Sequence, residues 1–312
     1  MTSAEAESTI INALGAVQFA LLPVKPRMRR KRRYHPMAST LWQSTAADDD
    51  REPPKVDTSV AHIARVYDYW LGGKNHFAAD REAGDQAVRA YPDMYMSVRQ
   101  NRAFLQRAVR YLTGAGVRQF LDIGTGLPSS DNTHEVAQSI APESRVVYVD
   151  NDPIVLAHAR ALLTSRPEGV TGFLDADARD TGTVLAQAGK LLDFGKPVAV
   201  MLIAVLHLIT EDDDPYQLVS DLMAAVPSGS YLVVSHVASD LQQQSPGVNE
   251  AAAALSQVMF QRVTARSQEQ VLRLFEGLEI LEPGIVPVQN WRPDGNPEAV
   301  RSAMRGGVGR KP

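Results

Sequence analysis

The stretch that decides the fold is Phe120-Leu121-Asp122-Ile123-Gly124-Thr125-Gly126-Leu127-Pro128-Ser129. A short apolar run of this kind predicts a buried strand, and the glycines after it predict a tight loop. Gly124 and Gly126 lack side chains where a backbone must approach a ligand, and they tolerate positive φ. Because open α/β sheets bind ligands beyond the carboxyl ends of their strands, the stretch predicts a binding site at this loop.

Downstream of this strand, apolar runs alternate with helical patterns, as expected for an open α/β sheet. The runs are nearly continuous in apolar residues, which is typical of strands covered by helices on both faces. Five such alternations predict a mostly parallel sheet with right-handed crossovers, and two closing runs predict an antiparallel end. The predicted strands are 120–123, 146–149, 172–174, 198–206, 231–235, 278–281 and 285–288, and the predicted helices are 153–164, 181–192, 215–225, 250–263 and 267–275.

Three helical patterns precede the sheet, at about 59–71, 80–90 and 94–112. We therefore predict four parts for the chain. A disordered basic extension and linker occupies 1–56, and an N-terminal helical cap or lid occupies 57–115. The binding domain follows at 116–293, and a flexible C-terminal tail closes the chain at 294–312. Met37 is also a candidate translation start, which would make the basic extension an artefact of gene assignment.

Composition excludes several classes of protein. The 312 residues contain no Cys, which removes disulfides, thiolate nucleophiles, zinc-thiolate sites and iron–sulfur clusters. No run of about 18 apolar residues is present, so we expect no membrane span and a cytoplasmic protein. Residues 1–36 hold seven basic and two acidic side chains, which leaves 25 basic and 34 acidic residues in 37–312. The acidic body argues against a nucleic-acid partner.

The glycine loop departs from the dinucleotide fingerprint. That fingerprint needs a third Gly or Ala where this chain has Ser129, which follows a disruptive Pro128. Asp122 stands two residues before Gly124, where a carboxylate suits a cationic ligand better than a diphosphate. An NAD-dependent oxidoreductase is therefore disfavoured, and the chain also lacks a catalytic Tyr-x-x-x-Lys arrangement. A tight structural turn remains the alternative for the loop itself.

The next two predicted strands also end in acidic residues. Asp150, followed by Asn151, stands where a carboxylate accepts hydrogen bonds from the two ribose hydroxyls of an adenosine ligand, while Asp152 is the better helix cap. Asp177 and Ala178 follow the third strand, where a carboxylate and a backbone N–H can recognise adenine. With Asp122, these residues favour a positively charged adenosine ligand such as S-adenosylmethionine over ATP or NADP.

These segments carry a family resemblance. Residues 120–128, 147–153 and 175–180 resemble the first three motifs of class I S-adenosylmethionine-dependent methyltransferases. More closely, the chain resembles, over about 57–293, a bacterial family first catalogued as DUF574 and now called the S-adenosyl methyltransferase family. The resemblance implies the methyltransferase fold and cofactor. Its strings are Ala64-Arg65-Val66-Tyr67-Asp68-Tyr69-Trp70-Leu71-Gly72-Gly73-Lys74-Asn75, Asn101-Arg102-Ala103-Phe104-Leu105, 120–128, 148–153 and Trp291-Arg292-Pro293.

The segment after Leu71 predicts a lid. Gly73, Lys74 and Asn75 lie on a helix break and are candidates for contacts with the cofactor. The family has Asp-Asn-Phe after the lysine where this chain has Asn-His-Phe, which leaves the contacts of positions 75 and 76 open. Nearby aromatic residues line an acceptor pocket or contact a sulfonium in one interpretation, and pack on the sheet in the other.

Two histidines end the fourth and fifth predicted strands. His207 and His236 are the candidate catalytic bases because either ring can titrate near neutral pH. The alternative is that both orient loops, since methyl transfer by in-line displacement often needs no base. The acidic run 211–214, with His207, is one candidate site for a hard cation. Asp214 before Pro215 is better explained as a helix cap, and we expect no metal.

The sequence thus predicts an S-adenosylmethionine-dependent methyltransferase that acts on a small-molecule acceptor by in-line displacement. The alternative is a non-catalytic protein that binds or senses S-adenosylmethionine or S-adenosylhomocysteine. The acceptor, the base and the oligomeric state are left open by the sequence.

Overall fold

A computed structural model describes residues 41–43, 57–162, 165–241, 245–259, 262–295 and 302–312. The helices and all but one of the strands lie within residues 57–312, and one additional short strand lies at 41–43. The predicted basic extension and the candidate start at Met37 fall outside the described residues. Within the described part of the chain, no helix combines the length and apolarity needed to cross a membrane.

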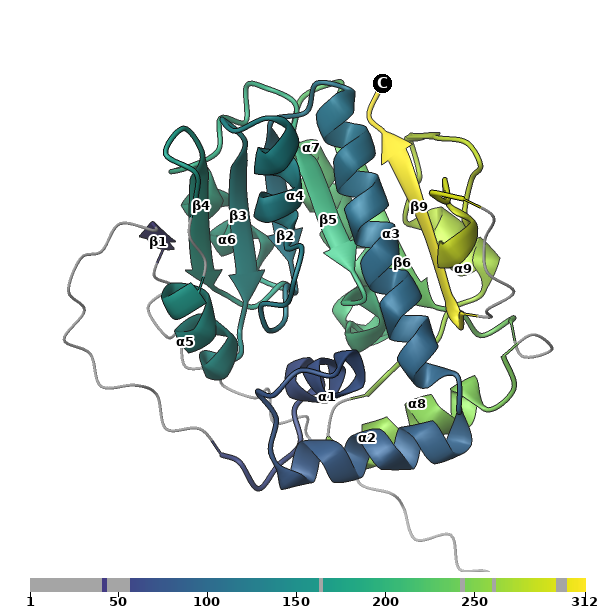
Figure 1. Ribbon diagram of the computed structural model, residues 1–312. Coiled ribbons are helices and arrows are strands. Elements are labelled where there is room, and N and C mark those ends of the chain that lie inside the picture. The colour runs from purple at the N-terminus through teal and green to yellow at the C-terminus, as the bar shows by residue number, and fades with distance from the viewer. Residues whose placement is uncertain (1–40, 44–56, 163–164, 242–244, 260–261, 296–301) are drawn as a thin grey trace, which may run out of the picture. The chain divides into compact units, whose positions relative to one another are not determined.

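The core of the protein is a mixed sheet whose central five strands are parallel (Figure 1). Their spatial order is β4-β3-β2-β5-β6, so the chain starts in the middle, winds outward to β4 and then returns beside β2. The switch point between β2 and β5 is where such sheets bind ligands. The parallel strands are β2 (Gln119–Ile123), β3 (Arg145–Asp150), β4 (Val170–Asp175), β5 (Ala199–Ile203) and β6 (Tyr231–Val237).

Antiparallel strands complete both edges. β9 (Met304–Arg310) pairs with β6 along its whole length. β7 (Glu279–Ile280) and β8 (Val286–Pro287) each pair with β9. At the other edge, β1 (Leu41–Gln43) pairs with β4. The predicted antiparallel end of the sheet is therefore confirmed, but the two closing runs pair with β9 and not with each other.

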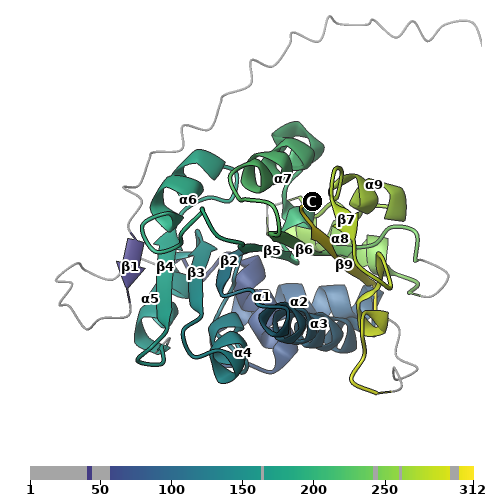
Figure 2. The same ribbon diagram turned by 90° about the horizontal axis from the view of Figure 1, so that it is seen from above.

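Helices cover both faces of the sheet (Figure 2). Alternation along β2 explains this, because Phe120 faces one apolar cluster whereas Leu121 and Ile123 face the other. The first cluster includes α3 (Met94–Gly114), α4 (Thr133–Ile140) and α5 (Pro153–Leu162), and the second includes α6 (Thr181–Ala188), α7 (Pro215–Ala224) and α9 (Gln268–Arg273).

A third apolar cluster forms a helical layer at the carboxyl edge of the parallel strands (Figure 1). Its helices are α1 (Ile63–Leu71), α2 (Ala78–Ala90) and α8 (Val248–Val258). We predicted a cap from 57–115 alone. The layer instead combines α1 and α2 with the distant α8, whereas α3 packs mainly on the sheet, because its apolar stripe contacts the strands through residues such as Phe104 and Leu105.

The predicted flexible tail at 294–312 is wrong for its last part, because β9 lies inside the sheet. The sequence did not predict this strand because it contains three glycines, and glycine is uncommon in strand interiors. A neighbouring side chain packs closely against each of them, at Gly306, Gly307 and Gly309. A Cβ at Gly306 would come within 2.9 Å of Phe104, and one at Gly309 within 2.8 Å of Phe275. The glycines let a helix and a neighbouring segment pack directly on the strand backbone.

Gly306→Val should therefore destabilise the protein by about 2 kcal/mol or more, because the added branches would overlap Phe104 and Val288. Urea unfolding of the variant measures this change. Gly114→Ala is the matched control, since a Cβ there meets nothing within 4 Å, and it should leave stability unchanged or slightly raised. An unchanged free energy of unfolding for Gly306→Val would contradict the packing described for β9.

Candidate functional site

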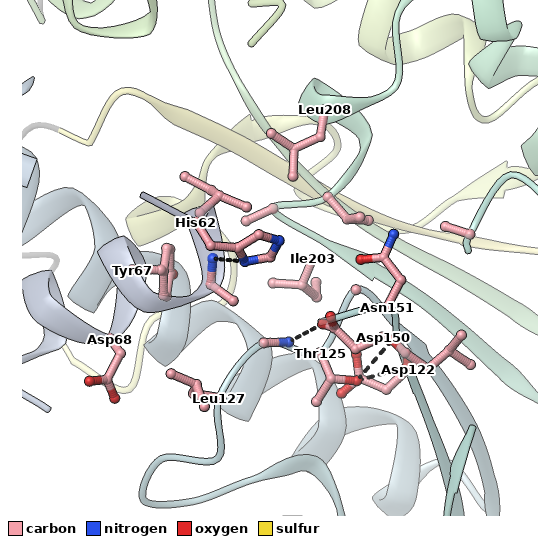
Figure 3. A pocket seen from close by; sticks show the side chains of 18 of the residues that line it. His62, Tyr67, Asp68, Asp122, Thr125, Leu127, Asp150, Asn151, Ile203 and Leu208 are labelled. Carbon is pink, nitrogen blue, oxygen red and sulfur yellow. Dashed lines mark hydrogen bonds between the residues drawn. The ribbon is translucent and has the colours of Figure 1, made fainter. Parts of the chain in front are cut away.

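A cavity opens at the carboxyl ends of β2, β3, β4 and β5, at the switch point of the sheet (Figure 3). It encloses about 1200 Å³ of empty space, part of which is open to solvent. Its floor is built by the loops after these strands, and its other walls come from α1 and α3. Eight of the residues predicted to bind the cofactor line it: Asp122, Gly124, Thr125, Gly126, Asp150, Asn151, Asp177 and Ala178.

The glycine loop folds as its sequence predicts. Gly124 and Gly126 both have positive φ, at 73° and 68°. A Cβ on Gly124 would lie 2.4 Å from a methyl carbon of Val205, so this position also requires glycine for close packing. The Gly124 N–H donates to the carbonyl of Val149 at 2.8 Å, and the Thr125 hydroxyl donates to the carbonyl of Asp122 at 3.0 Å. The loop is thereby fixed against β3.

Asp122 is buried at the end of β2, with only 4 % of its surface exposed. Its carboxylate accepts a hydrogen bond from the hydroxyl of Thr133 at 2.7 Å, at the start of α4. Burial raises the pKa of Asp122 to about 6, against the opposing effects of Thr133 and the Arg102 charge. A cation bound in the cavity would therefore relieve the cost of keeping this carboxylate ionised.

Asp150 holds the glycine loop and the next helix together. One of its oxygens accepts from the Gly126 N–H at 2.8 Å, and the other accepts from the Asp152 N–H at 3.0 Å. Burial raises the pKa of Asp150 despite these two hydrogen bonds. Asp152 accepts from the Ile154 N–H at 2.8 Å and thus caps α5, as the sequence predicted.

The third acidic strand end is already paired within the protein. The guanidinium of Arg179 hydrogen-bonds both carboxylate oxygens of Asp177, and this pairing lowers the pKa of Asp177 against the opposing effect of burial. The sequence did not show this pairing, and a contact of Asp177 with the cofactor stays a prediction. Of the three strand-end carboxylates, Asp177 alone forms an ion pair with a guanidinium among the described residues.

Helix α1 also lines the cavity. The sequence pointed to Tyr67 as one of the aromatic residues of an acceptor pocket, but it assigned no ligand contact to His62 or Asp68. His62, at its N-cap, brings Nδ1 within 2.7 Å of an Asp152 oxygen and so connects the helix to the end of β3. Tyr67 and Asp68 line the cavity from the same helix (Figure 3). The Tyr67 hydroxyl accepts from the Asn101 side-chain amide at 2.9 Å. The family strings contained most of these residues but gave no indication of their roles.

The predicted lid residues have a different position. Gly73, Lys74 and Asn75 are absent from the described lining of the cavity. They fold back on Asp68, which accepts from the Asn75 N–H at 2.8 Å, and a Cβ on Gly73 would overlap the Asp68 carboxylate. Their direct contact with a cofactor stays a prediction, and the structure gives them the role of fixing Asp68 on the cavity wall.

The two candidate bases differ in their surroundings. His236 is fully buried, its Nε2 accepts from the Arg266 guanidinium at 2.7 Å, and its Nδ1 is 2.8 Å from the Val237 carbonyl. Burial, and then the neighbouring His207, lower its pKa well below the ordinary value. The structure places His236 outside the described lining of the cavity, because Arg266 holds it in the core. His207 is also buried, but its Nδ1 has no hydrogen-bond partner.

The acidic run after His207 is structural. Asp214 accepts from the Gln217 N–H at 3.0 Å and caps α7, as predicted. Glu211 pairs with the buried Arg266 at 3.0 Å. Among the described residues, no group of three or more metal-ligating side chains comes together.

Comparison with known proteins shows the family to which the chain belongs. The model of a family described as S-adenosyl methyltransferase matches residues 49–312, which extends the resemblance beyond 293 to include β9. The crystal structure of a DUF574 family protein from Streptomyces avermitilis is 44 % identical, with a TM-score of 0.79, covering 83 % of this chain and all of that one. A candidate methyltransferase from Thermobifida fusca is 39 % identical, with a TM-score of 0.75, covering 82 % of this chain and 96 % of that one. No curated protein matches the chain.

The residues of the cavity fit the adenosyl cofactor that the family name implies. Asp150 offers carboxylate oxygens at the strand position that recognises ribose hydroxyls. Asp122 is a buried carboxylate whose raised pKa shows that a positive partner would stabilise it. The loop between them has no side chain at Gly124 or Gly126 to obstruct a ligand. S-adenosylmethionine supplies an electrophilic methyl group on a sulfonium, and these residues would bind and orient it.

Asp122→Asn should change stability and affinity in opposite directions. The folded-state pKa of about 6 lies above the ordinary value of about 3.9 for an aspartate side chain. The ionised carboxylate therefore lowers stability as pH rises through this range, and the full cost persists above it. Removing it should raise the free energy of unfolding of the ligand-free protein by up to about 3 kcal/mol at pH 7.5 and by little at pH 4.5. Asparagine keeps an oxygen for Thr133.

The same variant should bind S-adenosylhomocysteine at least tenfold more weakly at pH 7.5, because the ligand's ammonium group loses a buried counter-charge. Urea unfolding at the two pH values and calorimetric titration at pH 7.5 measure the two effects. Asp221→Asn, on the exposed face of α7, is the matched control and should change neither. Lower stability together with unchanged affinity would overturn the role given to Asp122.

Proposed function

The chain belongs to the S-adenosyl methyltransferase family, and we propose that it transfers the methyl group of S-adenosylmethionine to a small-molecule acceptor. The helical layer at the strand ends is the observation that favours a small-molecule acceptor. Helix α1 lines the cavity through His62, Tyr67 and Asp68, so the acceptor must reach the cofactor beneath a helix (Figure 3).

This enclosure limits what can react. Methyl transfer requires the acceptor atom, the methyl carbon and the sulfur to lie nearly in line, with the reacting atoms about 3 Å apart. A small molecule can enter beneath α1 whole, whereas a polymer would have to insert one residue past the helix. The excess of acidic residues in 37–312 also disfavours a polyanionic substrate.

The reaction itself is a displacement in which all atoms are accounted for. A lone pair on the acceptor's oxygen or nitrogen forms the new bond to the methyl carbon. The carbon–sulfur bond breaks, its electron pair stays on sulfur, and S-adenosylhomocysteine is released. The acceptor's proton passes to solvent or to a neighbouring group. The protein contributes chiefly by binding and orienting the two reactants.

Arg102 is our candidate for the carboxylate of the cofactor's methionine group. It lines the cavity from α3 and donates to the Asn132 side-chain oxygen at 2.9 Å and to two backbone carbonyls. Its Nε is buried without a hydrogen-bond partner. Because Arg179 is occupied by Asp177, Arg102 is the better-placed cation for a bound carboxylate.

Arg102→Met should weaken S-adenosylhomocysteine binding by a factor of about 10 to 100, since a charge-assisted hydrogen bond contributes about 1.5–3 kcal/mol. Arg99→Met is the control, because Arg99 is exposed on the same helix and should bind the ligand normally. Calorimetry on both variants decides the matter. Equal affinity in the wild-type protein and Arg102→Met would rule out this contact.

The proposed activity is tested by measuring S-adenosylhomocysteine release from S-adenosylmethionine in the presence of a metabolite library, total RNA, duplex DNA or a protein extract. We expect release with one or more small molecules and none with the polymers. Release that requires a polymer would contradict the small-molecule assignment. Sustained turnover would also exclude the binding-only alternative.

A further inference from the structure

A second, apolar space adjoins the cofactor cavity, and we call it the apolar chamber. It has about 610 Å³ of empty space, part of which is open to solvent. It is lined by residues of α1, α3 and α8 and by the segments after β5 and before β9. Three residues line both spaces: Ile63 and Tyr67 on α1, and Ala204 at the end of β5. A molecule in the chamber would therefore lie next to the cofactor's cavity.

The chamber is almost free of unsatisfied polar groups. The Trp70 indole N–H donates to the Gly84 carbonyl at 3.3 Å, and the Ser97 hydroxyl bonds to the Ser302 hydroxyl at 3.0 Å. The Tyr67 hydroxyl is engaged with Asn101 and Val98. No charged side chain is among the described residues of its lining. A charged ligand would lose its hydration here without gaining a partner.

His207 is the exception. It lines the chamber with only 7 % of its surface exposed, and its Nδ1 is buried without a hydrogen-bond partner. Burial, reinforced by the nearby charge of Arg266, lowers its pKa to about 4, so the ring is neutral near pH 7. A neutral ring nitrogen without a partner can bond one hydroxyl or N–H group of a ligand.

The backbone at the junction of the two spaces is strained. Ala204 has φ at 55°, a conformation that non-glycine residues seldom adopt. Its N–H donates to the Ser235 hydroxyl at 3.0 Å, which helps to hold this geometry. Strain of this kind persists where the surrounding structure enforces it and is common at functional sites.

We propose that the apolar chamber is the acceptor site, and that the acceptor is a neutral, largely apolar molecule whose single hydroxyl or N–H group bonds to His207 Nδ1. This assignment rests on the proposed function and gives its acceptor a chemical class. The apolar wall explains why the ligand must be hydrophobic, and the unpartnered nitrogen explains why it must carry one polar atom. The three shared residues place the chamber beside the cofactor's cavity.

The test uses the full chain saturated with S-adenosylhomocysteine and the probe 2-naphthol, which is neutral, apolar and carries one hydroxyl group. Fluorescence titration should show saturable binding of 2-naphthol. We expect 2-naphthoate, whose carboxylate is ionised, to bind at least tenfold more weakly. Equal binding of the two probes would overturn the proposal.

Two variants on one helix locate the probe. Ala252→Phe should fill the chamber and weaken 2-naphthol binding at least tenfold, because Ala252 lines it. Ala253→Phe is the matched control, since Ala253 is exposed on the same helix, and it should bind as the wild type does. Both should retain S-adenosylhomocysteine affinity, which also shows that they fold. Unchanged 2-naphthol binding in Ala252→Phe would place the probe elsewhere and refute the assignment.

A third variant isolates the polar contact. His207→Phe keeps an aromatic ring but removes the nitrogens, so it should weaken 2-naphthol binding several-fold and leave the binding of naphthalene, which has no hydroxyl group, unchanged. Equal losses for both probes would show that His207 only packs, and would refute its hydrogen bond. These measurements test binding alone. The probe can fail to bind while methyl transfer to small molecules is still observed, and the probe can bind while methyl transfer is absent. The two proposals can therefore fail separately.

Discussion

The site depends on two carboxylates buried side by side at the carboxyl edge of a parallel sheet. Asp122 is the penultimate residue of β2 and Asp150 is the last residue of the adjacent β3, so strand pairing alone brings them to the same cavity. Burial raises the pKa of both, which means that their ionised forms lack the solvation they would have in water. Backbone N–H groups and the Thr133 hydroxyl compensate in part. A cationic adenosyl cofactor would complete that compensation, so these poorly solvated carboxylates coincide with the ligand site.

A helical layer turns this open edge into a partly enclosed cavity. Helix α1 is connected to the end of β3 through His62 and Asp152, and α2 packs against α8 from the far end of the sequence. The layer separates two kinds of environment, a cavity with polar and charged groups and an apolar chamber, which meet at Ala204. This division corresponds to the two reactants of a methyl transfer, since S-adenosylmethionine is charged and polar whereas the acceptor that we propose is neither.

Much of the fold was predictable because hydrophobic periodicity identifies buried strands directly. The glycine loop, the acidic strand ends and the caps at Asp152 and Asp214 follow local rules that one sequence displays. The failures involve partners distant in sequence or in space. The glycines of β9 are explained by Phe104 and Phe275, and His236 is withdrawn into the core by Arg266. Arg179 neutralises Asp177 from only two residues away, but sequence alone does not show which way its side chain points.

The most direct test of the account is a crystal structure of the full chain with S-adenosylhomocysteine and 2-naphthol bound together. We predict that the ribose hydroxyls lie within hydrogen-bond distance of Asp150 and that the ligand's ammonium group lies on the side of Asp122. We also predict that the naphthol ring lies between α1 and α8, with its oxygen bonded to His207. A naphthol molecule outside the apolar chamber, or a ribose bound away from Asp150, would contradict it.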